Sequence, residues 1–224
     1  MTYRFTSHIV ASYYSNTYLH KSNHQPSEEI LAEKKLGTVA ALISNQGGSS
    51  RRLYYIKYLK RYIDVTVYGK HSVPCPKDVD CVEFIAKNYY FYLSFENSLC
   101  QDYTTEKFFR MLHYTIVPVV LGLSNYSYFI PSSGFIDVNN FEGVAPLAQY
   151  MREVRQDKEK YLSYFSWKKD YVWNKNTFFT PFCDLCLRLH LDSQPNVIED
   201  IDAWWHENTC QKPRKMKAFS SFHW

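Results

Sequence analysis

Residues 95–107 (FENSLCQDYTTEK) hold the side chains best suited to binding a sugar nucleotide. Lys107 can pair with a diphosphate, whereas the carboxylate of Glu106 would repel phosphate and is better suited to accept hydrogen bonds from sugar hydroxyls. Asn97 can both donate and accept. A helix expected to open near residue 104 would add free N–H groups and the positive end of its dipole, which favour an anion. The segment therefore predicts a site that takes a diphosphate together with hydroxyls.

The same residue types also have an ordinary structural interpretation. A glutamate in the first turn of a helix complements the helix dipole, and a lysine beside it is usually solvated. A further candidate, Arg52, follows Gly47 and Gly48 at the expected start of another helix, where it could bind a phosphate oxygen bidentately. Arginine on an exposed helix is common, however. Spacing alone therefore favours the structural interpretation.

Short apolar strands alternate with amphipathic helices over most of the chain. Strands are expected at residues 38–44, 63–68, 89–95, 116–121 and 135–138, and helices at 51–62, 105–115 and 144–155. This alternation is typical of an α/β domain, in which a Rossmann-like parallel sheet carries helices on both faces. Ligands of such sheets bind outside the carboxyl ends of the strands, where residues 95–107 fall. Pro118 predicts that its strand lies at an edge or begins after the proline.

Composition and missing motifs exclude several other classes. The 224 residues carry 26 basic and 22 acidic side chains, and this net charge of +4 is too small to indicate a nucleic-acid partner. No Walker loop is present, and residues 45–50 (NQGGSS) do not supply the glycine fingerprint of a dinucleotide-binding fold. No apolar stretch approaches the roughly twenty residues that span a bilayer, so no transmembrane segment is expected in this chain.

The segment FENSLCQDYTTEK resembles the FENS and TEK signature of glycosyltransferase family 10, the α1,3-fucosyltransferases, and the spacing of its two halves matches. Further similar stretches are 41–45 (ALISN), Arg52 with the LYY that follows, 63–69 (IDVTVYG), 117–122 (VPVVLG), 128–141 (YFIPSSGFIDVNNF) and 161–168 (YLSYFSWK). The similarity runs from about residue 37 to 210. It implies a two-domain GT-B fold, of which this chain resembles the carboxyl-terminal, donor-binding half.

The resemblance also implies roles for particular residues. Arg52 and Lys107 would contact the diphosphate of GDP-fucose, Glu106 would accept hydroxyls of the donor, and Asn97 and Tyr103 would line the same pocket. The family inverts the anomeric centre through an oxocarbenium-like transition state, and it requires no metal or other cofactor. A base must deprotonate the acceptor hydroxyl. The family's amino-terminal domain normally supplies that base, so no catalytic residue is named in this chain.

Two functions and three segments are expected on this basis. The chain would belong to an α1,3-fucosyltransferase that modifies a glycan on a glycoprotein or glycolipid, or it would be a truncated remnant that binds GDP-fucose without transferring the sugar. Residues 1–30 would be a remnant of the inter-domain or amino-terminal region, with Met1–Arg4 resembling the family's MTYRRDSD motif. Residues 31–172 would form the donor-binding domain, and residues 173–224 a helical and irregular tail.

The resemblance implies a location in the Golgi lumen or at the Golgi cisterna membrane, where the full-length relatives are membrane-anchored. The cysteines and a glycosylation sequon are consistent with this location. Six cysteines are present, and Cys183 and Cys186 form a CxxC that could be a zinc half-site, a redox pair or two disulfide partners. A zinc site needs a second pair at suitable spacing, which is missing, and a redox pair belongs at the strand-to-helix turn that opens a thioredoxin-like unit, whereas this CxxC comes late. Disulfides in an oxidising compartment are therefore favoured over free buried thiols. Asn125 begins an N-x-S sequon and is a candidate glycosylation site.

Overall fold

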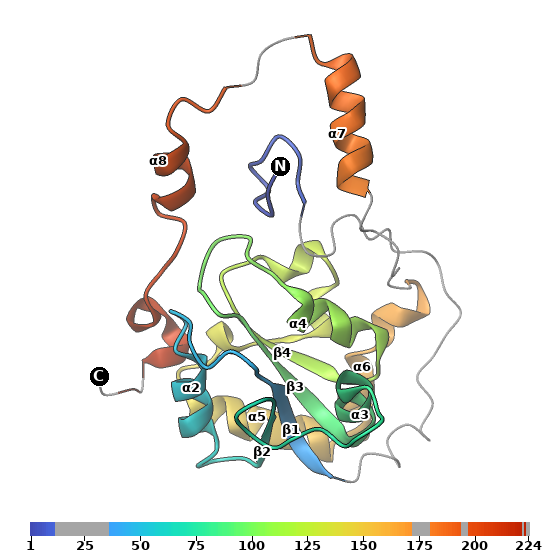
Figure 1. The fold of residues 1–224 in the computed structure, drawn as a ribbon. Helices are drawn as coiled ribbons and strands as arrows, with labels where there is room; N and C mark the ends of the chain where they lie inside the picture. Colours follow the sequence, from blue (N-terminus) through green and yellow to red (C-terminus); the bar gives the residue numbers. More distant parts are fainter. Residues whose placement is uncertain (12–35, 172–179, 194–196, 221, 223–224) are drawn as a thin grey trace.

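A computed structural model describes residues 1–11, 36–171, 180–193, 197–220 and 222 (Figure 1). Five parallel strands form one sheet in the order β2-β1-β3-β4-β5. The strands are β1 (Gly37–Leu42), β2 (Val65–Tyr68), β3 (Tyr89–Phe95), β4 (Val117–Leu121) and β5 (Ile136–Asp137). Every expected strand is present, with ends shifted by no more than two residues. The predicted α/β fold with a parallel sheet is confirmed.

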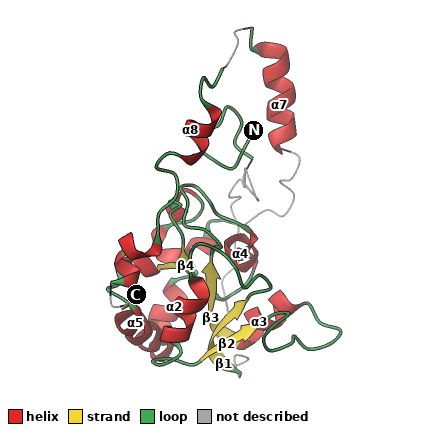
Figure 2. Cartoon of the chain, turned by 60° about the vertical axis from the view of Figure 1, so that its left-hand side comes forward, coloured by secondary structure: helices red, strands yellow, loops and turns green. Residues whose placement is uncertain are grey.

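Helices cover both faces of this sheet. The helices of the described chain are α2 (Arg52–Leu59), α3 (Cys81–Asn88), α4 (Glu106–Phe109), α5 (Val144–Gln156), α6 (Lys158–Ser163), α7 (Thr180–Leu191) and α8 (Ile201–His206). Of these, α7 and α8 lie away from the sheet. Figure 2 shows α2 and α5 on one side of the sheet and α3 on the other. The helix expected at residues 105–115 is shorter than predicted, because α4 has four residues and a 3-10 turn (Arg110–His113) continues it.

Alternate residues of the central strand β3 point to opposite faces, as the pleat requires. Phe91 and Phe95 join the core beneath α2 and α5, where they meet Leu147. Tyr92 joins the core on the other face with Ile85 of α3. Burial on both faces explains why the strands are almost continuous apolar runs in the sequence. The sheet is therefore a rigid platform for the loops that follow its strands.

Pro118 lies inside β4, where it pairs with Tyr92 of β3. On the other side of β4 the pairing with β5 begins only at Val119, which lies opposite Ile136. Pro118 thus has a neighbouring strand on one side only, and its missing N–H costs no ladder hydrogen bond toward β5. β4 is nevertheless an inner strand that begins at Val117, so the expectation of an edge strand, or of a strand that begins after the proline, is wrong.

The amino-terminal residues and the tail meet the loop that follows β3. The guanidinium of Arg4 donates to the backbone oxygen of Trp204 in α8 and lies 4.4 Å from the centroid of its ring. The backbone N–H of Phe5 donates to the carboxylate of Asp102 at 3.1 Å. In Figure 1 the amino-terminal residues and α8 lie above the sheet, whereas the chain after α8 returns to pack beside α2. No helix among the described residues is long and apolar enough to cross a membrane.

Two disulfides join four of the six cysteines, as expected for an oxidising compartment. Cys75 pairs with Cys81, and Cys100 after β3 pairs with Cys210 of the tail. The CxxC forms neither bridge, because Cys183 and Cys186 lie free and exposed on α7. The expectation that the CxxC is a disulfide pair is therefore wrong for the described chain. The predicted segment boundaries, at residues 30–31 and 172–173, lie outside the described residues and stay predictions.

Candidate functional site

A pocket of about 210 Å³ opens at the carboxyl ends of β1 and β3. Both ends, together with the starts of α2, α3 and α4, supply its walls. The lining residues are Leu42, Ser44, Asn45, Arg52, Val82, Tyr92, Asn97, Glu106, Lys107 and Arg110. Four of the five residues predicted to bind a donor are thus brought together: Arg52, Asn97, Glu106 and Lys107. This edge of a parallel sheet is where such folds bind ligands.

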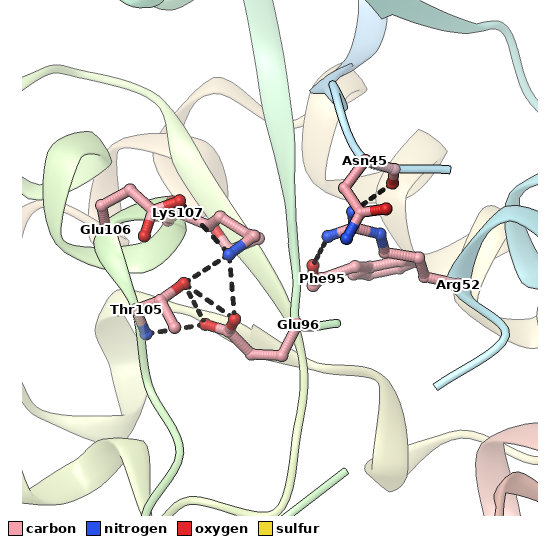
Figure 3. A network of polar contacts seen from close by, with 8 residues as sticks. Asn45, Arg52, Phe95, Glu96, Thr105, Glu106 and Lys107 are labelled. Carbon is pink, nitrogen blue, oxygen red and sulfur yellow. Dashed lines mark hydrogen bonds and ion pairs between the residues drawn. The ribbon is translucent and has the colours of Figure 1, made fainter. Parts of the chain in front are cut away.

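Lys107 is the centre of a polar network (Figure 3). Its ammonium nitrogen lies 3.2 Å from Oε2 of Glu96, 2.5 Å from Oγ1 of Thr105 and 3.3 Å from Oε1 of Glu106. Glu96 also accepts hydrogen bonds from the backbone N–H of Thr105 at 2.8 Å and from its hydroxyl at 2.8 and 3.0 Å. The hydroxyl of Ser94 in β3 donates to the backbone oxygen of Lys107 at 2.9 Å. Lys107 is thus held at both ends: Ser94 binds its backbone oxygen, and the three side-chain oxygens bind its ammonium group.

Glu96 is completely buried, so its charge depends on these partners. Burial raises the pKa of Glu96 above its ordinary value, although the Lys107 charge and the Thr105 hydrogen bonds lower it. Because Glu96 takes the N–H of Thr105, the N-cap of α4, that N–H is not free for an anion. The expected anion site at this helix start is therefore partly filled by the protein itself. The ammonium group of Lys107 therefore remains as the cation that this helix start offers to a ligand.

Glu106 lines the pocket from the first turn of α4. Burial raises the pKa of Glu106, but the Lys107 charge and hydrogen bonds to the carboxylate outweigh this, so its pKa is below its ordinary value. Its side chain keeps 34% of its surface exposed, against 13% for Lys107. Glu106 is therefore an ionised acceptor that faces the open part of the pocket.

Arg52 holds the ends of two strands together. One Nη donates to the backbone oxygen of Phe95 at 2.9 Å and the other to that of Asn45 at 2.7 Å (Figure 3). The residue is buried, and burial lowers the pKa of Arg52 below its ordinary value even though Glu96 raises it. Its Nε is buried without a hydrogen-bond partner among the described residues. Arg52 thus places a cation in the pocket wall while it fixes the loop after β1.

The loop between β1 and α2 approaches Asn97 closely. Gly48 has a φ of +122°, and a Cβ there would lie 2.5 Å from the backbone oxygen of Asn97, so only glycine fits. The N–H of Ser50 donates to the same oxygen at 3.0 Å. The side-chain Oδ1 of Asn97 is buried and has no hydrogen-bond partner among the described residues. Glycine here serves close packing, and Asn97 keeps an unused acceptor beside the pocket.

The structure does not bring Tyr103 into the pocket lining. Its ring packs edge-on against Tyr3, with centroids 5.3 Å apart, and Tyr3 in turn contacts Trp205 of α8 at 5.6 Å. The predicted role of Tyr103 in donor binding stays a prediction. Asn125 lies exposed, and its side chain accepts a hydrogen bond from the N–H of Ser127 at 3.1 Å. Glycosylation at that residue also stays a prediction.

Several residues of the site were not predicted from the sequence, and three of them are charged or aromatic. Glu96 fixes Lys107, the Tyr92 ring lines the pocket from β3, and Arg110 adds an exposed cation from the 3-10 turn after α4. A carboxylate directly after a buried strand was the available signal for Glu96, because such a group needs a buried cation as its partner. No comparable signal distinguished Tyr92 from other core tyrosines or Arg110 from other surface arginines.

The raised pKa of Glu96 gives the stability of the chain a defined pH dependence. In the unfolded chain this carboxyl ionises near its ordinary pKa of about 4.3. Between that pH and the higher folded pKa the native state binds more protons, so its stability falls as the pH rises through this window. Each unit of pKa difference corresponds to about 1.4 kcal/mol. Glu96→Gln removes this contribution, so the free energy of unfolding of the parent should fall relative to that of the variant as the pH rises through this window.

Urea unfolding of both proteins across this pH range measures the effect. The isosteric amide keeps an acceptor for Thr105, so the variant is a fair reference. Parallel pH profiles for the two proteins would show that Glu96 ionises in the native state as it does in the unfolded chain.

The fold and the position of the pocket define a Rossmann-like α/β domain, the class that binds ligands at the carboxyl ends of parallel strands. Residues 32–204 match the model of glycosyltransferase family 10 (fucosyltransferase), carboxyl-terminal part. The chain belongs to this family.

Individual relatives agree with this assignment. The chain is 39% identical over 188 residues to alpha-(1,3)-fucosyltransferase C of Drosophila melanogaster, an alignment that covers 82% of this chain and 43% of that protein. It is 37% identical to a 3-galactosyl-N-acetylglucosaminide 4-alpha-L-fucosyltransferase of Homo sapiens, covering 92% of this chain and 56% of that protein. The chain thus spans about half the length of the curated relatives that it matches.

Solved structures support the fold. A crystal structure of an alpha1,3-fucosyltransferase with GDP-fucose matches with a TM-score of 0.58 and 20% sequence identity, covering 74% of this chain and 51% of that one. A second, with GDP, matches with a TM-score of 0.58 and 22% identity. At this level of identity the likeness establishes the fold alone.

Proposed function

We propose that this chain is the donor-binding part of an α1,3-fucosyltransferase, which transfers fucose from GDP-fucose to a glycan on a glycoprotein or glycolipid with inversion. The observation that carries the proposal is the pairing of Lys107 with the carboxylate of Glu106 in one pocket at the carboxyl edge of the sheet. Membership of the fucosyltransferase family and the names of the relatives support the reaction type.

The leaving group of this reaction is GDP, and its diphosphate gains negative charge as the bond to fucose breaks. Lys107, Arg110 and the more deeply buried Arg52 are the cations that line the pocket. Preorganised cations at the point where charge develops are an effective means of stabilising a transition state. We assign neutralisation of the diphosphate to these three side chains, in place of a metal ion.

We assign binding of the donor's sugar hydroxyls to Glu106. Its lowered pKa keeps the carboxylate ionised at neutral pH, so it accepts hydrogen bonds from hydroxyls and does not donate. Asn97 adds the acceptor that the protein leaves without a partner among the described residues. The pocket volume of about 210 Å³ is below the range of roughly 300–1,000 Å³ for whole small-molecule sites. The pocket therefore holds only part of the donor.

The proposal leaves the acceptor side to the rest of such an enzyme. No residue of this chain is assigned as the base that deprotonates the acceptor hydroxyl, because the family places that group in its amino-terminal domain. The two disulfides support a location in an oxidising compartment, and we place the enzyme in the Golgi.

Calorimetric titration of the purified chain with GDP-fucose, GDP and UDP tests the proposal. We expect GDP and GDP-fucose to bind at least about tenfold more tightly than UDP, the factor that corresponds to 1.4 kcal/mol. Circular dichroism on the same sample shows whether it is folded. A folded chain that binds none of the three, or that prefers UDP, would reject the donor assignment and favour a remnant that has kept only the architecture.

A further inference from the structure

The ammonium group of Lys107 already uses its full hydrogen-bonding capacity. An ammonium group has three N–H donors and no acceptor. Three oxygens lie within 3.3 Å of Nζ, one each from Glu96, Thr105 and Glu106. An incoming phosphate oxygen can therefore bind Lys107 only if one of these three partners leaves.

The partners differ in how easily they can be replaced. Glu96 and Thr105 are buried, and they bind each other through the backbone N–H and the hydroxyl of Thr105. If either left Lys107, a buried carboxylate would lose its cation or the N-cap of α4 would be disturbed, and both changes are costly. The Glu106 carboxylate is the most exposed of the three and lines the pocket. After this carboxylate moves away from Lys107, it can accept hydrogen bonds from solvent or from a ligand.

We propose that a diphosphate displaces Glu106 from Lys107, and that this exchange frees the Glu106 carboxylate to bind hydroxyls of the same ligand. The inference rests on the proposed function and adds a selection step to it. Glu96 and Thr105 remain in place as positioning residues that keep the ammonium aimed at the pocket.

The exchange favours ligands that carry both groups. Without a ligand, the Glu106 carboxylate pairs with the Lys107 ammonium group. A free phosphate or pyrophosphate must break this ion pair, and it then lies close to the negatively charged Glu106 carboxylate without offering it a hydroxyl. A sugar nucleotide supplies hydroxyls that take up the freed carboxylate. The site therefore discriminates against small inorganic anions.

Glu106→Gln separates competition for Lys107 from binding of the sugar hydroxyls. It removes the charge that competes for Lys107 and keeps the shape of the side chain. We expect the variant to bind inorganic pyrophosphate about three- to fivefold more tightly than the parent, the range of a surface ion pair. Binding of GDP-fucose should instead weaken by about fivefold, because a charged acceptor is lost. Opposite shifts for the two ligands are the signature of the exchange.

The matched control is Glu153→Gln, which removes a carboxylate 3.9 Å from Lys160, on α5 and outside the pocket. It should leave both affinities unchanged. If the parent binds GDP-fucose but Glu106→Gln shifts both ligands in the same direction, or leaves pyrophosphate binding unchanged, the exchange is wrong and the donor site stands. If the folded parent binds neither ligand, the proposed function fails and the exchange fails with it.

Discussion

Lys107→Met is expected to weaken the binding of GDP and of GDP-fucose by about the same factor, roughly 10- to 100-fold. The range follows from the loss of a charge-assisted hydrogen bond, about 1.5–3 kcal/mol, at 1.4 kcal/mol for each tenfold change. The effect is shared because both ligands carry the diphosphate and differ only in the sugar. Calorimetric titration of parent and variant with the two ligands measures it.

The same substitution also tests the buried pair. It leaves the fully buried Glu96 without the cation that lies 3.2 Å away, and breaking a buried pair in this way costs about 3–5 kcal/mol of stability. The double variant Lys107→Met/Glu96→Gln removes both charges, so it should regain most of the stability and none of the affinity. If the double variant regains the affinity that the single variant loses, Lys107 contributes to binding only by keeping the chain folded.

Removing the bridge between Cys100 and Cys210 is expected to lower the free energy of unfolding by about 4–5 kcal/mol. This bridge spans a sequence separation of 110 residues, and the chain-entropy relation gives about 4.7 kcal/mol for a loop of 100 residues. The bridge between Cys75 and Cys81 spans a separation of only 6, for which the same relation gives about 2 kcal/mol. Urea unfolding of the two double serine variants compares them directly.

The natural control for this experiment is the double variant Cys183→Ser/Cys186→Ser. Both thiols are free and exposed on α7, so their removal should leave stability unchanged. Equal losses in the control and in the Cys100–Cys210 variant would show that the CxxC takes part in a bridge after all.

The strands could be predicted from the sequence because their residues are apolar on both faces and their lengths are limited by turns. Helix α3 was not predicted from the apolar pattern, although Asp80 and Glu83 carry the signature of a capped start, in which the Asp80 carboxylate accepts a hydrogen bond from the Glu83 N–H. The helix after residue 104 was predicted too long, because its second half tightens into a 3-10 turn, which the sequence pattern does not distinguish from an α-helix.

The candidate site was likewise predictable only in part. Its chemistry was indicated by the residue types of Arg52, Asn97, Glu106 and Lys107, and the family signature identified it. Their contacts depend on tertiary structure. The guanidinium of Arg52 binds one carbonyl at the end of β3 and another just after β1, and Glu96 reaches Lys107 across the loop. The cysteine partners were equally out of reach, because six cysteines allow fifteen pairings.

The shortness of the outer strands has a consequence for how copies of this chain behave at high concentration. The sheet ends in β2, with four residues, and in β5, with two. An outer strand presents unpaired backbone groups to which a foreign strand can be added, and its capacity grows with its length. Both borders of this sheet are too short to template such an addition over more than a few residues. Aggregation that propagates from the borders of the folded sheet, the route to cross-β fibrils, is therefore disfavoured by the architecture itself.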